Sequence, residues 1–138
     1  MDTGGRRRTE GKPAPKRSLR VLIVDDDRDS LLTLGELLQS EGFDVQMLRR
    51  GAGVPAKVEQ FHPDVVLLDI GLPDRSGFDI AEELSERYGE HAPLLIAITG
   101  YSSEAERDMA RESGFHHFIA KPYDPQSLLR RLSALRPR

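Results

Sequence analysis

Residues 61–77, FHPDVVLLDIGLPDRSG, contain the stretch that decides the fold of this 138-residue chain. Their centre is the apolar run VVLL at 65–68, which ends at Asp69. A short aliphatic run bounded by turn residues is typical of a strand that is buried on both faces. Such strands form parallel sheets, whose ligand sites lie beyond the carboxyl ends of the strands. Asp69 stands at that end, where a carboxylate can be a nucleophile, bind a metal ion or merely cap the next turn.

The composition is that of one globular domain, with 38% hydrophobic and 31% charged residues. No apolar run approaches the roughly 20 residues that cross a membrane. The amino terminus lacks the apolar core of a signal peptide. The chain has no cysteine, which excludes disulfides and thiol catalysis. We therefore expect a cytoplasmic protein with no membrane partner.

Charge is distributed unevenly along the chain. Residues 1–18 hold six Lys/Arg against two Asp/Glu, a net charge of +4, whereas the remainder holds fourteen against twenty-one, a net charge of −7. The first segment has no large apolar residue after Met1, so we expect a disordered basic leader at 1–18 and one domain at 19–138. The leader is either a solvated tail or an arm that touches an acidic partner. The acidic body disfavours nucleic-acid binding by the folded domain.

The rest of the chain alternates between strand-like apolar runs and helical patterns. Strands are predicted at residues 19–24, 43–48, 65–69, 93–99 and 115–120, and helices around residues 31–38, 54–61, 78–88, 103–113 and 125–135. The second strand is more polar than the others and is expected at an edge of the sheet. Five strand–helix pairs predict an α/β, doubly wound (βα)5 flavodoxin-like fold. Its five-stranded parallel sheet has the order 2-1-3-4-5.

Polar residues follow the ends of four predicted strands. Asp25 and Asp26 end the first strand, Asp69 the third and Thr99 the fourth, and Lys121 follows the fifth. In this strand order they all lie at one edge, around the switch point between the first and third strands. Clustered carboxylates repel one another unless a cation joins them, and Mg²⁺ prefers oxygen ligands. Such a cluster suits a phosphoryl group in transfer, with Asp69 as the nucleophile that forms an acyl phosphate.

Each of these residues also has an ordinary explanation when taken alone. Asp25, Asp26 and Asp27 can be loop and capping residues. Thr99 can end a strand with a local hydrogen bond, and Lys121 can be a surface lysine. Their placement at the same end of the appropriate strands favours a shared site.

Over residues 19–135 the chain resembles the receiver domain of two-component response regulators. The matching motifs are VLIVDDD at 21–27, PDVVLLDIGLP at 63–73 with a following glycine, IAIT at 96–99 and KP at 121–122. The phrases DIGLP, ITGY and GFHHFIAKP are similar to receivers attached to hybrid sensor kinases. The resemblance implies a domain that accepts a phosphoryl group from a histidine kinase or a histidine phosphotransfer protein. It leaves open whether the domain is a stand-alone regulator or part of a hybrid kinase.

The resemblance also implies roles at the phosphorylation site. Asp69 would be the phosphoacceptor, and Thr99 and Lys121 would contact the phosphoryl oxygens. A cis peptide bond between Lys121 and Pro122 would place the lysine ammonium in the site.

For the metal, the resemblance implies that Asp26, Asp69 and the backbone carbonyl of Gly71 bind Mg²⁺ directly, with Asp25 helping through water. Gly71 has no side chain and Tyr101 is bulky, and these two positions tune the access of water to the phosphoryl group.

The aromatic switch position of the family falls on Phe118. In the family, the threonine equivalent to Thr99 moves toward the phosphoryl group, and the aromatic side chain turns into the vacated space. This change alters the face of the fourth helix, fifth strand and fifth helix, where a downstream protein would dock. Because Phe118 has no hydroxyl, its switch is expected to work by packing alone.

Two other classes of function fit parts of the sequence. A phosphohydrolase that uses an aspartyl-phosphate needs an acid two residues after the nucleophile, where this chain has Gly71, and it needs a cap that binds substrate. A structural module with a decayed site conflicts with the complete set of carboxylates, Thr99 and Lys121. We therefore expect a signalling domain, not an enzyme in the usual sense, that supports its own Mg²⁺-dependent phosphorylation and dephosphorylation.

Overall fold

The computed structural model describes residues 18–100 and 103–135. The strands are β1 (Arg20–Val24), β2 (Asp44–Leu48), β3 (Val65–Asp69), β4 (Leu94–Thr99) and β5 (His117–Ala120). The helices are α1 (Arg28–Ser40), α2 (Val54–Phe61), α3 (Gly77–Tyr88), α4 (Glu104–Ser113) and α5 (Pro125–Ser133), with short 3-10 turns η1 (Gly51–Gly53) and η2 (Gly89–His91). The expected basic leader, apart from Ser18, and Tyr101 lie outside the described residues.

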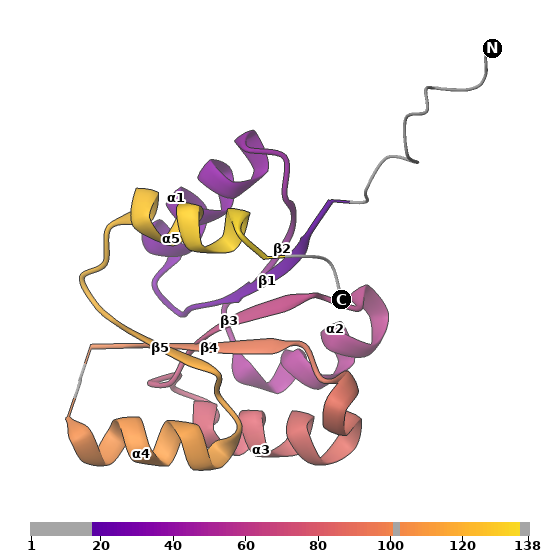
Figure 1. Ribbon diagram of the computed structural model, residues 1–138, viewed down its shortest axis with the longest axis vertical. Coiled ribbons are helices and arrows are strands. Elements are labelled where there is room, and N and C mark those ends of the chain that lie inside the picture. The colour runs from indigo at the N-terminus through magenta and orange to yellow at the C-terminus, as the bar shows by residue number, and fades with distance from the viewer. Residues whose placement is uncertain (1–17, 101–102, 136–138) are drawn as a thin grey trace.

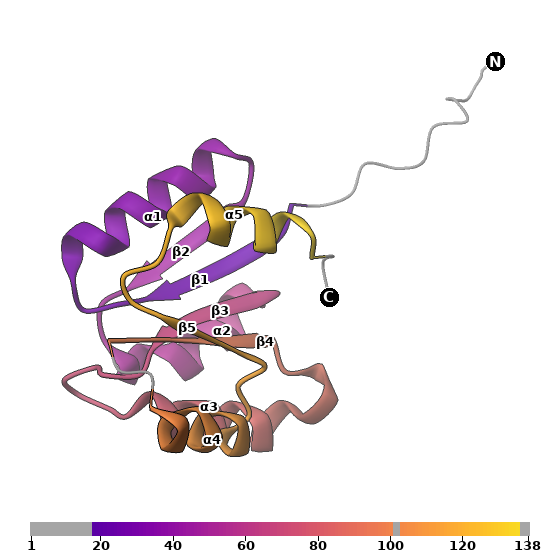
Figure 2. The same ribbon diagram turned by 60° about the vertical axis from the view of Figure 1, so that its left-hand side comes forward.

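The five strands form one parallel sheet in the order β2-β1-β3-β4-β5. Helices α1 and α5 cover one face of this sheet, and α2, α3 and α4 cover the other (Figures 1 and 2). The predicted doubly wound architecture and strand order are therefore confirmed. The polar strand β2 lies at an edge, as its sequence indicated.

The central strand β3 is buried along its whole length. Its side chains alternate between two cores: Val66 and Leu68 pack toward α2, α3 and α4, whereas Val65 and Leu67 pack toward α1 and α5. Fully burying each such side chain contributes about 1.5–3 kcal/mol to folding. A continuous apolar run, instead of an alternating one, is therefore the pattern that this position requires.

Side-chain caps and glycines set several helix ends. The Ser103 hydroxyl accepts a hydrogen bond from the N–H of Glu106, and the Asp124 carboxylate accepts one from the N–H of Gln126. Serine and aspartate are among the residues that most often cap the start of a helix in this way. Helix α4 ends at Gly114, whose φ of 109° lies in the left-handed region that favours glycine.

The connection from β3 to α3 turns back tightly at Gly77. The N–H of Gly77 donates to the carbonyl of Ile70 at 3.1 Å. A Cβ at position 77 would lie 2.7 Å from the Ile70 Cα, closer than two carbon atoms can approach. The loop that follows Asp69 therefore requires glycine where it enters α3.

We expect Gly77→Ala to lower the free energy of unfolding by about 1–3 kcal/mol, because the new methyl group meets backbone atoms that cannot move aside cheaply. Urea unfolding of the variant against the wild type measures this loss. Gly53→Ala is the matched control, since its Cβ would make an ordinary 3.6 Å contact with a Leu48 methyl group. Equal losses in the two variants would contradict the explanation.

Candidate functional site

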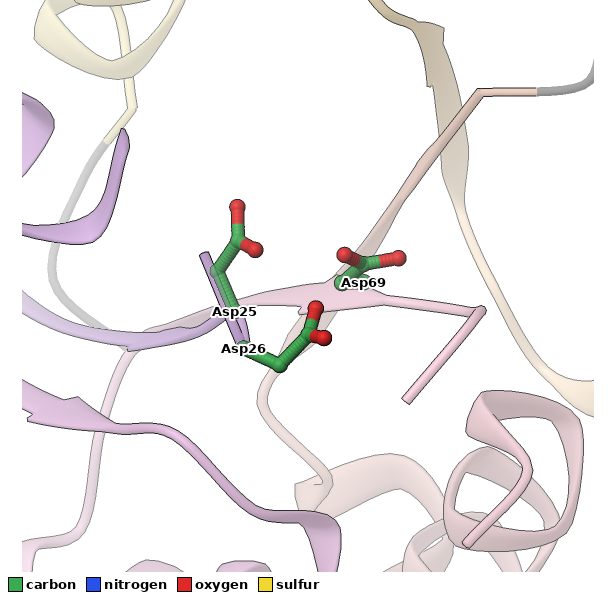
Figure 3. Close-up of side chains that lie close together, drawn as sticks. All are labelled: Asp25, Asp26 and Asp69. Atoms are coloured by element: carbon green, nitrogen blue, oxygen red, sulfur yellow. The ribbon is translucent and has the colours of Figure 1, made fainter. Parts of the chain in front are cut away.

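Three carboxylates meet where β1 and β3 end (Figure 3). The two strands are neighbours, with Val24 paired to Leu68, so Asp25 and Asp69 emerge side by side. Oxygens of Asp25, Asp26 and Asp69 all lie within 4.8 Å of one another. Asp25 and Asp69 are buried, whereas Asp26 is exposed.

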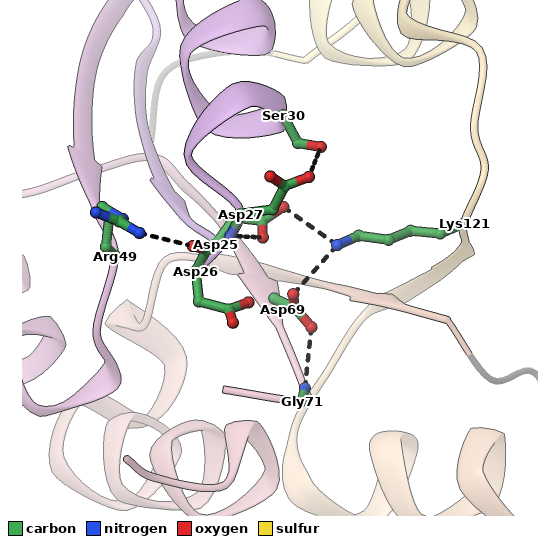
Figure 4. Close-up of polar contacts among 8 residues, drawn as sticks. All are labelled: Asp25, Asp26, Asp27, Ser30, Arg49, Asp69, Gly71 and Lys121. Atoms are coloured by element: carbon green, nitrogen blue, oxygen red, sulfur yellow. Dashed lines mark hydrogen bonds and ion pairs between the residues drawn. The ribbon is translucent and has the colours of Figure 1, made fainter. Parts of the chain in front are cut away.

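The Lys121 ammonium joins the two buried carboxylates (Figure 4). Its Nζ lies 3.2 Å from Oδ2 of Asp25 and 3.2 Å from Oδ2 of Asp69. Burial alone would lower the pKa of Lys121, but the charges of Asp69 and Asp25 outweigh it and raise that pKa above its usual value. Lys121 is therefore a cation at neutral pH. The Lys121–Pro122 peptide bond is cis, as predicted.

Backbone donors hold the other oxygen of each buried carboxylate. The N–H of Gly71 donates to Oδ1 of Asp69 at 2.9 Å, and the N–H of Asp27 donates to Oδ1 of Asp25 at 2.9 Å. Burial raises the pKa of Asp25, although the Asp27 N–H and Lys121 act in the opposite direction. Both side chains are thus fixed in position by two hydrogen-bond donors each.

The Asp26 carboxylate differs from the other two, because it makes no hydrogen bond or ion pair with any described residue. Only its backbone carbonyl is engaged, by the Arg49 guanidinium at 3.2 Å. An exposed, unpaired carboxylate beside the Asp69 oxygens offers the all-oxygen donor set that Mg²⁺ prefers. The residues present therefore fit a hard divalent cation.

Thr99 and Phe118 lie on neighbouring strands and on one face of the sheet. Thr99 is buried at the end of β4, and its carbonyl accepts the N–H of Lys121 at 2.7 Å. In the β4–β5 register Phe118 pairs with Ala97 and Ala120 pairs with Thr99. Because alternate residues of a strand share a face, Thr99 and the half-buried Phe118 both point toward the core under α3 and α4.

A cation on α4 covers the Phe118 ring. The Arg107 guanidinium carbon lies 5.4 Å from the ring centroid, within the range of a cation–π contact. The ring therefore has a contact that the expectation of a switch by packing alone did not include, and the way in which the switch works stays a prediction. Sequence reasoning missed Arg107, because nothing in a helical pattern tells which arginine will reach a neighbouring strand.

Asp74 is a second residue that sequence reasoning missed. Its carboxylate accepts the N–H groups of Gly51 at 2.9 Å and Ala52 at 2.8 Å, on the far side of the loop that follows Asp69. These donors, the Gly51 N–H above all, lower the pKa of Asp74. Asp74 thereby anchors the loop that carries Gly71. Its only sequence signal is a polar residue in a turn, which does not reveal partners more than twenty residues away.

Comparison with known proteins agrees with this geometry. The family model of the response regulator receiver domain matches residues 21–133. The transcriptional regulatory protein CreB of Escherichia coli (strain K12) is 36% identical over 115 residues, which cover 83% of this chain and 49% of CreB. The DNA-binding response regulator MtrA of Mycobacterium tuberculosis (strain ATCC 25618 / H37Rv) is 33% identical over 115 residues, 83% of this chain and 49% of MtrA.

A solved structure shows the same fold. The CheY-like response regulator receiver domain protein from Methanospirillum hungatei JF-1 superimposes with a TM-score of 0.78 at 30% identity, covering 84% of this chain and 91% of that one. The chain therefore belongs to the response regulator receiver domains of two-component systems, and it is a signalling domain. Receiver domains interact with histidine kinases and with downstream effectors, and they bind Mg²⁺ at an acidic pocket.

The chain spans about half the length of the curated relatives it matches. Within the described residues, no helix has the length and apolar character that crossing a bilayer would require.

Without metal, we expect Asp26→Asn to raise the free energy of unfolding by about 1 kcal/mol. That is the size of the repulsion between unit charges separated by a few ångström in a water-like medium, and Lys121 already has two other carboxylate partners. Urea unfolding in EDTA measures the change, with the exposed Asp44→Asn on β2 as control. A destabilised Asp26→Asn protein would show that the cluster is not repulsive.

Proposed function

We propose that Asp69 accepts a phosphoryl group from a phosphohistidine of a histidine kinase or of a histidine phosphotransfer protein. In this step a carboxylate oxygen of Asp69 attacks phosphorus, the bond from phosphorus to the imidazole nitrogen breaks, and an acyl phosphate forms. The observation that carries the proposal is the position of Asp69. It ends the central strand, is held by Gly71 and Lys121, and lies within 4.8 Å of two further carboxylates.

In this proposal Asp26, Asp69 and the backbone carbonyl of Gly71 hold Mg²⁺ directly, and Asp25 helps through water. Bound Mg²⁺ would neutralise the carboxylates and the oxygens of the incoming phosphoryl group. The unpaired carboxylate of Asp26 supports this assignment, because it can take a ligand without giving up a protein contact. The indirect role of Asp25, whose oxygens accept from Asp27 and Lys121, follows the family resemblance.

Lys121 and Thr99 would bind the phosphoryl oxygens. The Lys121 ammonium would exchange a carboxylate for a phosphoryl oxygen of the same charge sign, so it stays paired throughout. The Thr99 hydroxyl would donate a hydrogen bond to a phosphoryl oxygen. The backbone hydrogen bond from the Lys121 N–H to the Thr99 carbonyl keeps these two residues side by side. With Mg²⁺, these groups would let the domain support its own phosphorylation and dephosphorylation.

The output of the switch would be a contact with a downstream protein on the face of α4, β5 and α5. Thr99 would move toward the phosphoryl group, and Phe118 would turn into the vacated space. We place this activity in the cytoplasm, in a domain at 19–138 that follows a basic leader at 1–18. The name of MtrA describes DNA binding for that protein; for this acidic domain we propose a protein partner and no nucleic acid.

The acceptor can be tested with a small phosphodonor such as phosphoramidate. In Mg²⁺, the wild type is expected to gain the mass of one phosphoryl group and to lose it in base faster than in acid, as an acyl phosphate does. Asp69→Asn should gain none. Phosphorylation of the wild type in EDTA, and of Asp26→Asn in Mg²⁺, should each be about tenfold or more slower than that of the wild type in Mg²⁺. Intact-mass spectrometry reads each case, with Asp27→Asn as the control carboxylate. Wild-type phosphate uptake by Asp69→Asn would make another residue the acceptor.

The switch can be tested by NMR with beryllofluoride, which mimics the phosphoryl group. Signals of the Phe118 ring and of nearby methyl groups should shift on activation, and Thr99→Ala should remove much of that shift. The physical reason is that both side chains pack on the same face of adjoining strands. An unchanged environment around Phe118 would end the switch proposal while leaving Asp69 as acceptor.

A further inference from the structure

The segment that leaves the edge strand β2 contacts both loops that carry the proposed Mg²⁺ ligands. We call residues 48–52 the β2–α2 segment; none of them belongs to the carboxylate cluster. The segment is bonded to the loop after β1, which carries Asp26, and to the loop after β3, which carries Gly71. One short stretch of the sheet edge therefore restrains both loops.

Two contacts join the β2–α2 segment to the loop after β1. The carbonyl of Leu48 accepts the N–H of Asp25 at 3.1 Å. The Arg49 guanidinium donates to the carbonyl of Asp26 at 3.2 Å (Figure 4). The N–H of the same peptide group, which belongs to Asp27, donates to Oδ1 of Asp25 at 2.9 Å. This peptide group is thus bonded at both its oxygen and its nitrogen, which fixes the backbone from which the Asp26 carboxylate extends.

Two further contacts join the β2–α2 segment to the loop after β3. The N–H groups of Gly51 and Ala52 donate to the two oxygens of the Asp74 carboxylate at 2.9 and 2.8 Å. Gly51 can lie this close because it has no side chain: a Cβ there would lie 2.6 Å from Cδ1 of Ile80. Asp74 stands three residues beyond Gly71 in the same loop. Both Asp74 oxygens therefore tie this loop to the segment.

We propose that Arg49 and Asp74 are positioning residues for Mg²⁺. The proposal rests on the proposed function, in which Asp26 and the carbonyl of Gly71 bind the ion. Mg²⁺ requires near-ideal octahedral geometry, so its affinity depends on how accurately the ligand oxygens are placed. Arg49 fixes the backbone of one ligand-bearing loop and Asp74 that of the other, through the same segment. The relative placement of the two loops is thereby set from the edge of the sheet.

The sign of the Arg49 charge separates positioning from simple electrostatics. A guanidinium near a divalent cation repels it, so loss of that charge alone would strengthen Mg²⁺ binding. Loss of the hydrogen bond to the Asp26 carbonyl would weaken Mg²⁺ binding instead. For Asp74 the charge and the hydrogen bonds act in the same direction, and salt separates them, because it screens exposed charges.

The first measurement is made on the whole chain in EDTA, without metal. Hydrogen exchange of backbone amides, followed by NMR, reports whether each contact holds its loop. Arg49→Gln should speed exchange of the Asp27 amide about threefold or more, and Asp74→Ala should do the same for the Gly51 and Ala52 amides. Arg50→Gln is the matched control, because Arg50 is also exposed and its side chain makes no hydrogen bond with a described residue.

The second measurement is a Mg²⁺ titration followed by NMR at low and high salt. Arg49→Gln should weaken Mg²⁺ binding about fivefold, the size of one net hydrogen bond. Arg49→Lys keeps the charge and a donor and should recover part of this loss, whereas Arg50→Gln should lose nothing. Asp74→Ala should weaken binding about fivefold at both salt concentrations, and Asp74→Asn, which keeps one acceptor oxygen, should lose less.

Mg²⁺ binding by Arg49→Gln that equals or exceeds wild-type binding would overturn the role of Arg49. A loss in Asp74→Ala that vanishes at high salt, or that Asp79→Ala reproduces, would reduce Asp74 to a charge effect. Asp79 is the control carboxylate, since it is exposed on the first turn of α3. Urea unfolding of each variant excludes a loss of affinity through unfolding, and Arg49→Lys and Asp74→Asn decide the matter if a harsher variant does not fold.

Asp26→Asn in the same titration separates this proposal from the metal assignment. If Asp26→Asn binds Mg²⁺ like the wild type, Asp26 is not a ligand and the metal assignment fails, while amide exchange in EDTA still shows whether Arg49 holds the loop. If Asp26→Asn loses Mg²⁺ binding and Arg49→Gln keeps it, the metal assignment stands and the positioning role of Arg49 is wrong.

Discussion

Two buried carboxylates that share one ammonium hold this domain's site together. Asp25 and Asp69 are contributed by β1 and β3, and Lys121 follows β5, so a single Nζ with two 3.2 Å contacts connects three strands. Burying two such charges without a counter-ion would be costly. The ammonium offsets much of that cost, and the exposed Asp26 keeps a carboxylate directed at solvent. The site is thus built to be rigid on its inner side and open to a cation on its outer side.

Much of this arrangement follows from simple rules about parallel sheets. The run at 65–68 is apolar on every residue because helices cover both faces, and β2 is polar because it lies at an edge. Once the strands are assigned, their carboxyl ends must meet at one edge. That step brings Asp25, Asp26 and Asp69 together before any side-chain geometry is known. The convergence of the site is therefore a property of topology, and the sequence predicts it well.

What the sequence could not predict depends on side-chain reach between elements that are distant along the chain. The Asp74 carboxylate accepts hydrogen bonds from two backbone N–H groups more than twenty residues earlier in the chain. The Arg107 side chain reaches from α4 to the Phe118 ring on β5. Hydrophobic periodicity tells which face of a helix is buried, but long charged side chains lie at the border of that face. Their contacts are decided by local packing, and several arginines of α4 and α5 would have fitted the same pattern.

In the proposed switch, these contacts would carry a local event at the site toward the outer edge of the sheet. Strands β4 and β5 hold both the site residues and the Phe118 ring. The backbone N–H of Lys121 donates a hydrogen bond to the carbonyl of Thr99 at 2.7 Å, and Phe118 pairs with Ala97, two residues before Thr99. The strands themselves need not bend, since packed interiors rearrange between discrete states and do not deform smoothly. In the proposed switch, a change in the volume beside Thr99 would be felt by the half-buried Phe118 ring, which lies under Arg107. Because Arg107 belongs to α4, a displacement of the ring would end this cation–π contact and so alter the surface of that helix.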